Sequence, residues 1–297
     1  MKIYNNPNSQ TWPSILARPT INNQRLNISV SEILQKVRNE GDAALKFFNK
    51  KFDQVDLDFI EVTEDEIVAA KDQIDPELKK AIITAYQNIF KFHAAQKTNT
   101  LQVETMPGVK CWQKNVPIEK VGLYIPGGTA PLFSTILMLG IPAKVAGCKE
   151  IIMCTPPQKD GKINAAMLYT AQLVGIENIY KIGGAQAIGA MTYGTETIPQ
   201  VDKIVGPGNI YVATAKRMVF GAVGLDMVAG PSEILVICDG KTDPDWIAMD
   251  LFSQAEHDQE AQSILISWDA DFLDAVHHSM TNLLPKMERE TIITQSL

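Results

Sequence analysis

The sequence predicts an α/β fold built around parallel sheets. After residue 108, short β-rich runs alternate with helical patterns, which is typical of βαβ units. Glycine clusters fall at the ends of several of these runs, where ligand loops form in parallel sheets. At 297 residues, the chain is also close to the size at which a single core stops growing. We therefore expect two α/β domains.

The first third of the chain has the pattern of helices. Over residues 29–97, apolar residues recur at spacings of three and four, and Thr63 with Glu66 has the form of a capping box. Asp75 followed by Pro76 is typical of a helix start, with proline at the first helical position. Residues 1–14 carry little core of their own, so we expect an N-terminal helical arm.

The strand candidates are short runs rich in β-branched residues that end at glycine, proline or polar residues. They are 109–116, 120–125, 149–155, 178–183, 203–208, 233–239 and 263–268. Near the end of the chain, residues 272–290 have a helical pattern, and 291–297 should open a further strand.

Composition excludes several classes of partner. The net charge of −7 and the pI near 5.2 argue against a nucleic-acid partner, because phosphate backbones need a basic face. No apolar stretch approaches the roughly 18 residues of a membrane span, and the N-terminus lacks the apolar core of a secretory signal. We therefore expect a cytoplasmic protein without a membrane partner. The four cysteines form no C-x-x-C pair, so no disulfide framework is indicated.

Two strand ends are candidate ligand loops. In "KIVGPGNIYVATAKR", Gly206 and Gly208 would let the backbone approach a ligand, and the helix start at Asn209 would offer free N–H groups to a nucleotide phosphate. Taken alone, the loop is better explained as a tight turn without a ligand, and it lacks the G-x-G-x-x-G fingerprint. Tyr124 ends another strand, where an exposed ring could contact a flat ligand or simply belong to the core.

A polar pair follows an apolar helical run near the end of the chain. Gln254 and His257 are three residues apart on a helix that should begin at Asp243, so they would share one face. Such a pair forms either a hydrogen bond or part of a metal site, and zinc usually needs three or four protein ligands. Ser232, beside a Gly-Pro turn, would cap backbone groups or contact a substrate. A nucleotide-binding enzyme and a binding module therefore both remain open.

Five blocks in sequence order resemble histidinol dehydrogenase: "VGLYIPGGTAPLFSTILMLGIPAKVAGC", "GGAQAIGAMTYGT", "DKIVGPGNIYVATAKR", "VGLDMVAGPSE" and "SQAEHDQEAQS". The resemblance implies oxidation of L-histidinol through L-histidinal to L-histidine with two NAD, in histidine biosynthesis. It also implies zinc and a homodimer. For the fold, it implies two incomplete Rossmann-like domains, with 122–230 nested inside a host of 15–121 and 231–297.

The resemblance also implies roles for individual residues. Tyr124, Gln186 and Asn209 match positions that contact NAD, and Ser232 matches a position that contacts the substrate. Gln254 and His257 match two of the four protein ligands of a zinc ion that also binds the substrate. That helix face would then be half of a metal site.

The chain departs from the family pattern at its C-terminal end. The family's further Asp and His ligands and its catalytic Glu-His pair have no match up to Leu297, so no catalytic residue is assigned. His277 and His278 are not preceded by Glu and are interpreted as a solvated face. We therefore expect an incomplete fragment of the dehydrogenase. The alternatives are a catalytically silent nucleotide-binding module of the same fold and another NAD-linked alcohol dehydrogenase.

Overall fold

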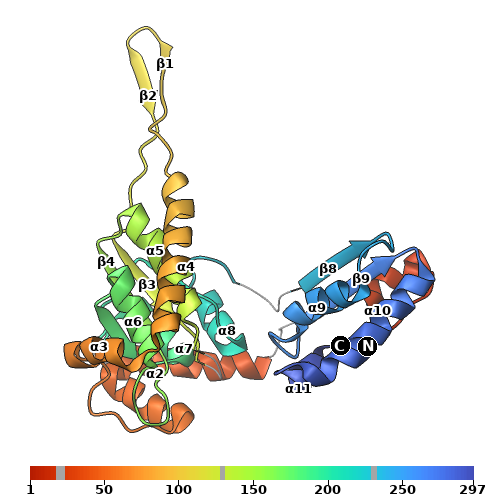
Figure 1. Ribbon diagram of the computed structural model, residues 1–297. Coiled ribbons are helices and arrows are strands. Elements are labelled where there is room, and N and C mark those ends of the chain that lie inside the picture. The colour runs from red at the N-terminus through yellow and green to blue at the C-terminus, as the bar shows by residue number, and fades with distance from the viewer. Residues whose placement is uncertain (18–23, 128–130, 229–232) are drawn as a thin grey trace. The chain divides into compact units, whose positions relative to one another are not determined.

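The computed structural model describes residues 1–17, 24–127, 131–228 and 233–297 (Figure 1). The chain forms two compact units: Met1–Asn22 together with Ala229–Leu297, and Asn23–Val228. The larger unit is thus inserted in the chain of the smaller one. None of the helices in the described residues is long and apolar enough to cross a membrane.

A five-stranded parallel sheet forms the centre of the larger unit. Its strands are β3 (Lys120–Tyr124), β4 (Glu150–Thr155), β5 (Asn178–Lys181), β6 (Lys203–Val205) and β7 (Gly224–Leu225). They lie in the order β5-β4-β3-β6-β7, with every neighbouring pair parallel. The chain moves outward from β3 to β5 and then returns to β6 on the other side of β3. This reversal creates a switch point, where parallel sheets form a ligand crevice at the carboxyl ends of their strands.

Seven helices accompany this sheet in the described part of the larger unit. They are α2 (Gln24–Phe48), α3 (Glu64–Ala70), α4 (Pro76–Ala95), α5 (Phe133–Ala146), α6 (Ala165–Val174), α7 (Gly184–Tyr193) and α8 (Ile210–Val219). Helix α5 packs against α4 and α6, whereas α7 packs against α2 and α8. The strands carry continuous apolar runs, and Leu123, Met153 and Ile179 are fully buried, as expected of a parallel sheet covered on both faces.

The predicted helix starts are confirmed. The Thr63 N–H donates to Glu66 Oε2 at 2.9 Å and the Glu66 N–H donates to Thr63 Oγ1 at 3.3 Å, which completes the capping box. Asp75 caps α4 by accepting a hydrogen bond from the Glu77 N–H at 2.8 Å. Helix α2 is interrupted at Gly41, whose φ of 53° is not helical. A π-helical segment, η2 (Asn49–Asp53), follows α2, and a 3-10 turn, η3 (Lys71–Gln73), follows α3.

The strand expected at 109–116 does not join the parallel sheet. Strands β1 (Gln102–Met106) and β2 (Val109–Trp112) form an antiparallel hairpin outside it, and every residue of both strands is exposed. The hairpin projects from the rest of the larger unit (Figure 1). Its turn is Pro107–Gly108, with Gly108 at a φ of 81°, so local turn chemistry decides this pairing.

The smaller unit contains a single parallel βαβ element. The described elements of the smaller unit are η1 (Ser9–Thr11), α1 (Trp12–Ile15), β8 (Glu233–Cys238), α9 (Pro244–Ala255), β9 (Gln262–Ser267), α10 (Ala270–Leu283), η4 (Leu284–Lys286) and α11 (Glu290–Ser296). The βαβ element is β8-α9-β9. Strands β8 and β9 pair in parallel, and α9 and α10 pack on them around Leu251, Phe252 and Phe272. Asp243 caps α9 as predicted.

The strand predicted over 291–297 is wrong, because this segment is helix α11. Ile293 and Leu297 are four residues apart, and both pack on the core of the smaller unit. That spacing places them on one helical face, whereas a strand would have needed alternating burial.

The compact units also differ from the predicted domain boundaries. Residues 23–121 belong with the parallel sheet rather than with the C-terminal segment 231–297. The physical reason is helix packing: α2 packs on α7 and α8, and α4 packs on α5. The predicted order, with one α/β unit inserted in the other, is retained.

Candidate functional site

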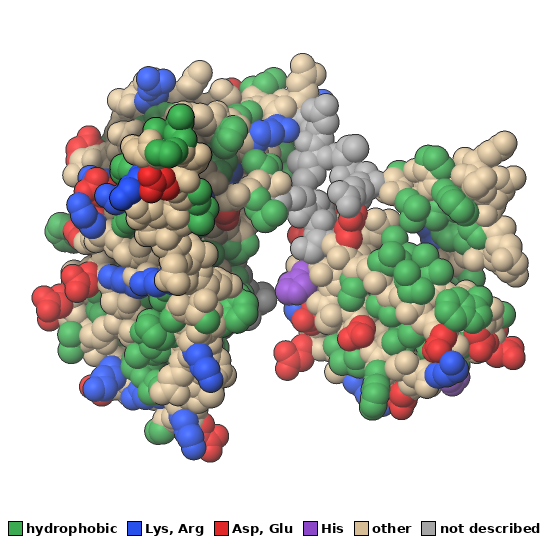
Figure 2. Space-filling model, turned by 90° about the horizontal axis from the view of Figure 1, so that it is seen from above, with side chains coloured by type: hydrophobic (Ala, Val, Ile, Leu, Met, Phe, Trp, Pro, Cys, Tyr) green, Lys and Arg blue, Asp and Glu red, His purple; other side chains and the backbone are tan. Residues whose placement is uncertain are grey.

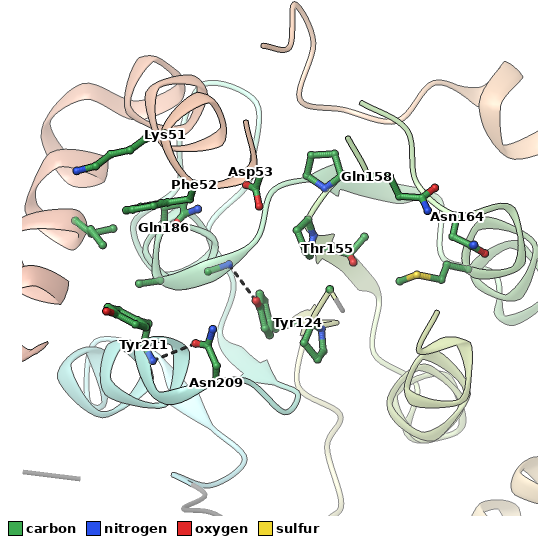
Figure 3. Close-up of a pocket in the computed structure, with 18 of the residues that line it drawn as sticks. Lys51, Phe52, Asp53, Tyr124, Thr155, Gln158, Asn164, Gln186, Asn209 and Tyr211 are labelled. Carbon is green, nitrogen blue, oxygen red and sulfur yellow. Dashed lines mark hydrogen bonds between the residues drawn. The ribbon is translucent and has the colours of Figure 1, made fainter. Parts of the chain in front are cut away.

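A pocket of about 760 Å³ lies within the larger unit at the carboxyl ends of its strands (Figure 3). Its walls come from the ends of β3 and β4, the starts of α7 and α8, and the segment that ends at η2. The residues that line it include Lys51, Phe52, Asp53, Tyr124, Pro126, Thr155, Met167, Gly184, Ala185, Gln186, Asn209 and Tyr211. A cavity of this size suits a small organic ligand.

The structure brings together the three residues predicted to contact NAD. Tyr124 ends β3, Gln186 lies in the first turn of α7, and Asn209 precedes α8, yet all three line this pocket. The loops after β3 and β6 flank the switch point of the sheet, which explains why residues so far apart in sequence meet here.

Tyr124 is buried, so of the two alternatives the structure excludes the exposed ring. Only 3% of it is exposed, and its hydroxyl accepts a hydrogen bond from the Gly184 N–H at 3.0 Å. Burial raises the pKa of Tyr124 to about 12, with a further contribution from the charge of Asp53. The phenol therefore stays neutral at physiological pH. It ties β3 to the start of α7 and keeps its own proton available for donation.

Gln186 is also buried, with 2% exposed, and its amide folds back over the first turn of α7. Gly184 has a φ of +65°, and a Cβ there would lie 2.7 Å from Gln186 Oε1, so glycine leaves the room that the amide occupies. The residue before α7 is Gly183, which has no side chain to cap the helix, and the Gly184 N–H is bonded to the Tyr124 hydroxyl. The first turn of α7, at Gly184, Ala185 and Gln186, therefore presents its positive end to the pocket.

Asn209 caps α8 through its side chain. Asn209 Oδ1 accepts hydrogen bonds from the Tyr211 N–H at 3.1 Å and the Val212 N–H at 3.2 Å. Two of the N–H groups that we expected to hold an anion are therefore already bonded. At the start of α7 the Gly184 N–H is bonded to the Tyr124 hydroxyl, and the next N–H groups, at Ala185 and Gln186, are better placed for that role. With its oxygen used in the cap, Asn209 turns its amide nitrogen toward the pocket (Figure 3).

The Gly-Pro-Gly loop is explained by packing inside the protein. Gly206 has a φ of +135°, and a Cβ there would lie 2.1 Å from the Tyr124 carbonyl oxygen. The Gly206 N–H donates to Asp226 Oδ2 at 2.8 Å, and the Gly206 carbonyl accepts from Lys216 Nζ at 2.9 Å. Lys216 is 4% exposed and forms an ion pair with Asp226. These contacts fix the loop that leads to Asn209.

Burial by itself would raise the pKa of the Asp226 carboxyl. The hydrogen bond from the Gly206 N–H and the ion pair with Lys216 outweigh that effect and keep the pKa below its ordinary value. Asp226 is therefore ionised at neutral pH. Sequence patterns did not identify Lys216 or Asp226. The feature that could have indicated a buried ion pair was a lysine on the same side of α8 as the buried residues Ala215 and Val219.

Phe52 and Asp53 are pocket residues that the sequence did not single out. Both lie in η2, which follows α2 without a loop, so "NKKFDQ" has the pattern of an ordinary helix end. Asp53 Oδ2 is buried without a hydrogen-bond partner in the protein. Burial raises the pKa of Asp53 to about 6.

Gln254 and His257 do not share one helix face as predicted. Helix α9 ends at Ala255, and His257 lies in the following turn, where its N–H donates to the Gln254 carbonyl at 3.2 Å. The side-chain Nε2 of Gln254 is buried without a partner, and amide oxygen and nitrogen positions are interchangeable, so this group suits a missing ligand. His257 is exposed. Ser232 lies outside the described residues.

A complete zinc site is not present in the part of the chain that the structure describes. No group of three or more His, Cys, Asp or Glu side chains there could hold a metal ion. Gln254 and His257 supply two candidate ligands, and zinc sites usually have at least three. These residues alone therefore do not fit a zinc ion.

Comparison with known proteins agrees with the fold. The sequence model of the histidinol dehydrogenase family matches residues 16–297. The chain belongs to the histidinol dehydrogenase family. The predicted resemblance is therefore confirmed, and with it the assignment to the dehydrogenases.

Relatives in this family cover nearly the whole chain. The histidinol dehydrogenase of Bacteroides thetaiotaomicron is 49% identical over 298 residues, which is 100% of this chain and 70% of the relative. That of Pseudomonas putida is 49% identical over 286 residues, covering 95% of this chain and 65% of the relative. The crystal structure of histidinol dehydrogenase from Elizabethkingia anophelis matches with a TM-score of 0.94 and 50% identity, over 99% of this chain and 68% of that one.

A more distant structure shares the fold alone. Methylmalonate-semialdehyde dehydrogenase from Oceanimonas doudoroffii matches with a TM-score of 0.50 at 14% identity. Together with the histidinol dehydrogenase match, this confirms the α/β prediction with its parallel sheet.

Proposed function

We propose that this chain supplies the NAD-binding part of a histidinol dehydrogenase, which oxidises L-histidinol through L-histidinal to L-histidine with two NAD. The observation that carries this proposal is the meeting of Tyr124, Gln186 and Asn209 in one pocket at the switch point of the sheet. Family membership supports the reaction, and the pocket supports the cofactor.

The pocket offers a complementary group for each part of a dinucleotide. The first turn of α7 presents its positive end, with the N–H groups of Ala185 and Gln186, to the pyrophosphate. The Tyr124 hydroxyl and the Asn209 amide nitrogen are donors for ribose or carboxamide oxygens. Phe52, Pro126 and Met167 supply apolar surface for the rings. When bound, NAD accepts a hydride from the substrate; the residues of this chain bind and orient it.

Substituting Asn209 tests the cofactor pocket without destroying the helix cap. Asn209→Asp keeps an oxygen for the Tyr211 and Val212 N–H groups but removes the amide donor and adds a negative charge. We expect NAD affinity, measured by calorimetry, to fall about tenfold or more. Asn209→Ser, which keeps the cap without a charge, should show a smaller loss. Unchanged affinity in both variants would remove Asn209 from the site.

A second candidate is a nucleotide-binding module of the same fold without catalysis. The pocket lies entirely within the larger unit, so the structure alone supports binding as well as it supports chemistry. Formation of NADH in the presence of L-histidinol distinguishes the two, because only the dehydrogenase produces it. A simple alcohol that outcompetes histidinol would instead favour another NAD-linked alcohol dehydrogenase.

Gln254 and His257 would be two ligands of a zinc site that these two residues alone do not complete. We expect the 297-residue chain to retain less than stoichiometric zinc after dialysis, because the described residues supply two ligands and one of them is a neutral amide. Elemental analysis of the dialysed protein, with the His257→Ala variant as control, measures this. Stoichiometric zinc in the wild type that is lost in His257→Ala would show a complete site.

The remaining parts of the proposal concern partners and location. A homodimer follows from the family resemblance and a cytoplasmic location from the sequence composition, and both remain predictions. The substrate is a small molecule, and a nucleic-acid partner is not proposed. On the face drawn in Figure 2, acidic and basic side chains of the described residues are interspersed rather than gathered into a basic patch.

A further inference from the structure

Asp53 is a pocket residue whose buried carboxylate oxygen has no partner among the described residues. Its Oδ2 is buried and has no hydrogen-bond partner there, and none of the ion pairs among the described residues includes it. Figure 3 shows the carboxylate turned toward the space that Gln186, Thr155 and Tyr124 surround. An unpartnered buried polar group destabilises the folded protein, so its presence in a ligand pocket indicates a partner supplied by the ligand.

The segment that carries Asp53 is firmly held. Asn49 Nδ2 donates to the Lys181 carbonyl at 2.9 Å in a buried contact, and the Val55 N–H donates to the Asn49 carbonyl at 3.3 Å. The ring of Phe52 stacks on Phe48 with centroids 5.5 Å apart. The direction of the carboxylate therefore follows from packed structure rather than from a loose loop.

The neighbouring charges leave Asp53 negative at neutral pH. The other titratable groups that line the pocket are Lys51, Tyr124 and Tyr211, and Tyr124 is a neutral phenol. Lys51 is exposed, and its ammonium lies over the Phe47 and Phe52 rings, 5.9 and 5.3 Å from their centroids. Its charge is screened by water, whereas that of the buried Asp53 oxygen is not. The ligand group facing Asp53 should thus donate hydrogen bonds and carry no negative charge.

We propose that Asp53 binds the hydroxyls of the adenosine ribose and thereby selects NAD over NADP. A carboxylate accepts hydrogen bonds from two adjacent hydroxyls, and it repels the 2′-phosphate that NADP carries at that place. The ring of Phe52 is 50% exposed beside it and offers a stacking surface to a base. A reacting nicotinamide must be enclosed with its substrate, so the nucleoside at this exposed ring is the adenosine. This assignment rests on the proposed NAD site.

Calorimetry with NAD and NADP on the full chain tests the assignment. In Asp53→Asn, we expect NAD affinity to fall about tenfold or more, because a hydrogen bond to a charged acceptor becomes weaker. Affinity for NADP should be unchanged or higher, so that the preference for NAD falls by at least about tenfold. The matched control is Asp56→Asn, since Asp56 belongs to the same loop but is 73% exposed and pairs with Lys50. This control should leave both affinities unchanged.

Thermal unfolding shows whether the variants are folded. Asp53→Asn removes a buried charge without a protein partner, so it should melt at or above the temperature of the wild type. Wild-type affinity for NAD that persists in Asp53→Asn would overturn the role of Asp53 while the proposed function stands. Equal losses for NAD and NADP would overturn the selectivity. A wild type that binds neither dinucleotide would overturn both the proposed function and this assignment.

Discussion

Replacing Lys216 by methionine is expected to lower the free energy of unfolding by about 3 kcal/mol. The methionine fits the buried space of the lysine stem but leaves the Asp226 carboxylate and the Gly206 carbonyl without the Nζ donor. Breaking a buried pair from one side leaves a charge that the folded protein must desolvate. This expected loss is at the low end of the range for buried ion pairs because the Asp226 side chain is 29% exposed. Urea-induced unfolding followed by circular dichroism measures the loss.

The loss from Lys216→Met should depend on pH. In the wild type the pKa of Asp226 is lowered, so its contribution to stability is present above the ordinary carboxyl pKa of about 4 and disappears as the pH falls through its folded value. The difference between wild type and variant should therefore shrink in acid. Adding Asp226→Asn should restore part of the stability. Lys149→Met, at a pair that is 76% and 62% exposed, should cost far less; an equal effect would contradict the role of the buried pair.

Much of the fold could be predicted because local signals and burial agree. The capping box at Thr63, the proline starts at Pro76 and Pro244, and the strands of the parallel sheet all follow from short patterns that the structure retains. The failures lie where tertiary packing decides. The last segment was expected to be a strand, but Ile293 and Leu297 pack on one helical face.

The candidate site was only partly predictable for the same reason. The glycine-rich strand end before α8 pointed to Asn209, because strand ends of one parallel sheet meet at one edge, whereas Gln186 came from the family resemblance. Asp53 lies more than 60 residues before Tyr124 in the sequence, on a π-helical segment with no turn signature, and only the packing of Asn49 on β5 brings it to the pocket. The sequence left open whether the Tyr124 ring is exposed or buried, because only the tertiary structure shows that the start of α7 covers this strand end through Gly184.

Gly206→Ala is expected to lower the free energy of unfolding of the larger unit by about 3 kcal/mol or more. The added Cβ would lie 2.1 Å from the Tyr124 carbonyl oxygen, and both the loop and the strand are backbone that cannot move aside without breaking other contacts. The φ of +135° adds strain for any residue with a Cβ. Because Tyr124 and Asn209 flank this loop, NAD affinity should fall by about tenfold or more as well. Thermal unfolding and calorimetry measure the two effects.

A matched glycine separates the steric clash from the backbone strain in this prediction. Gly221 has a φ of +100°, but a Cβ there would meet nothing within 4 Å, so Gly221→Ala carries strain alone and should cost about 1–2 kcal/mol. Gly221 does not line the NAD pocket, so its alanine variant should bind NAD like the wild type. The excess loss in Gly206→Ala then measures the clash with Tyr124. Equal losses in the two variants, with equal NAD affinity, would show that the close approach of Gly206 to Tyr124 does not shape the pocket.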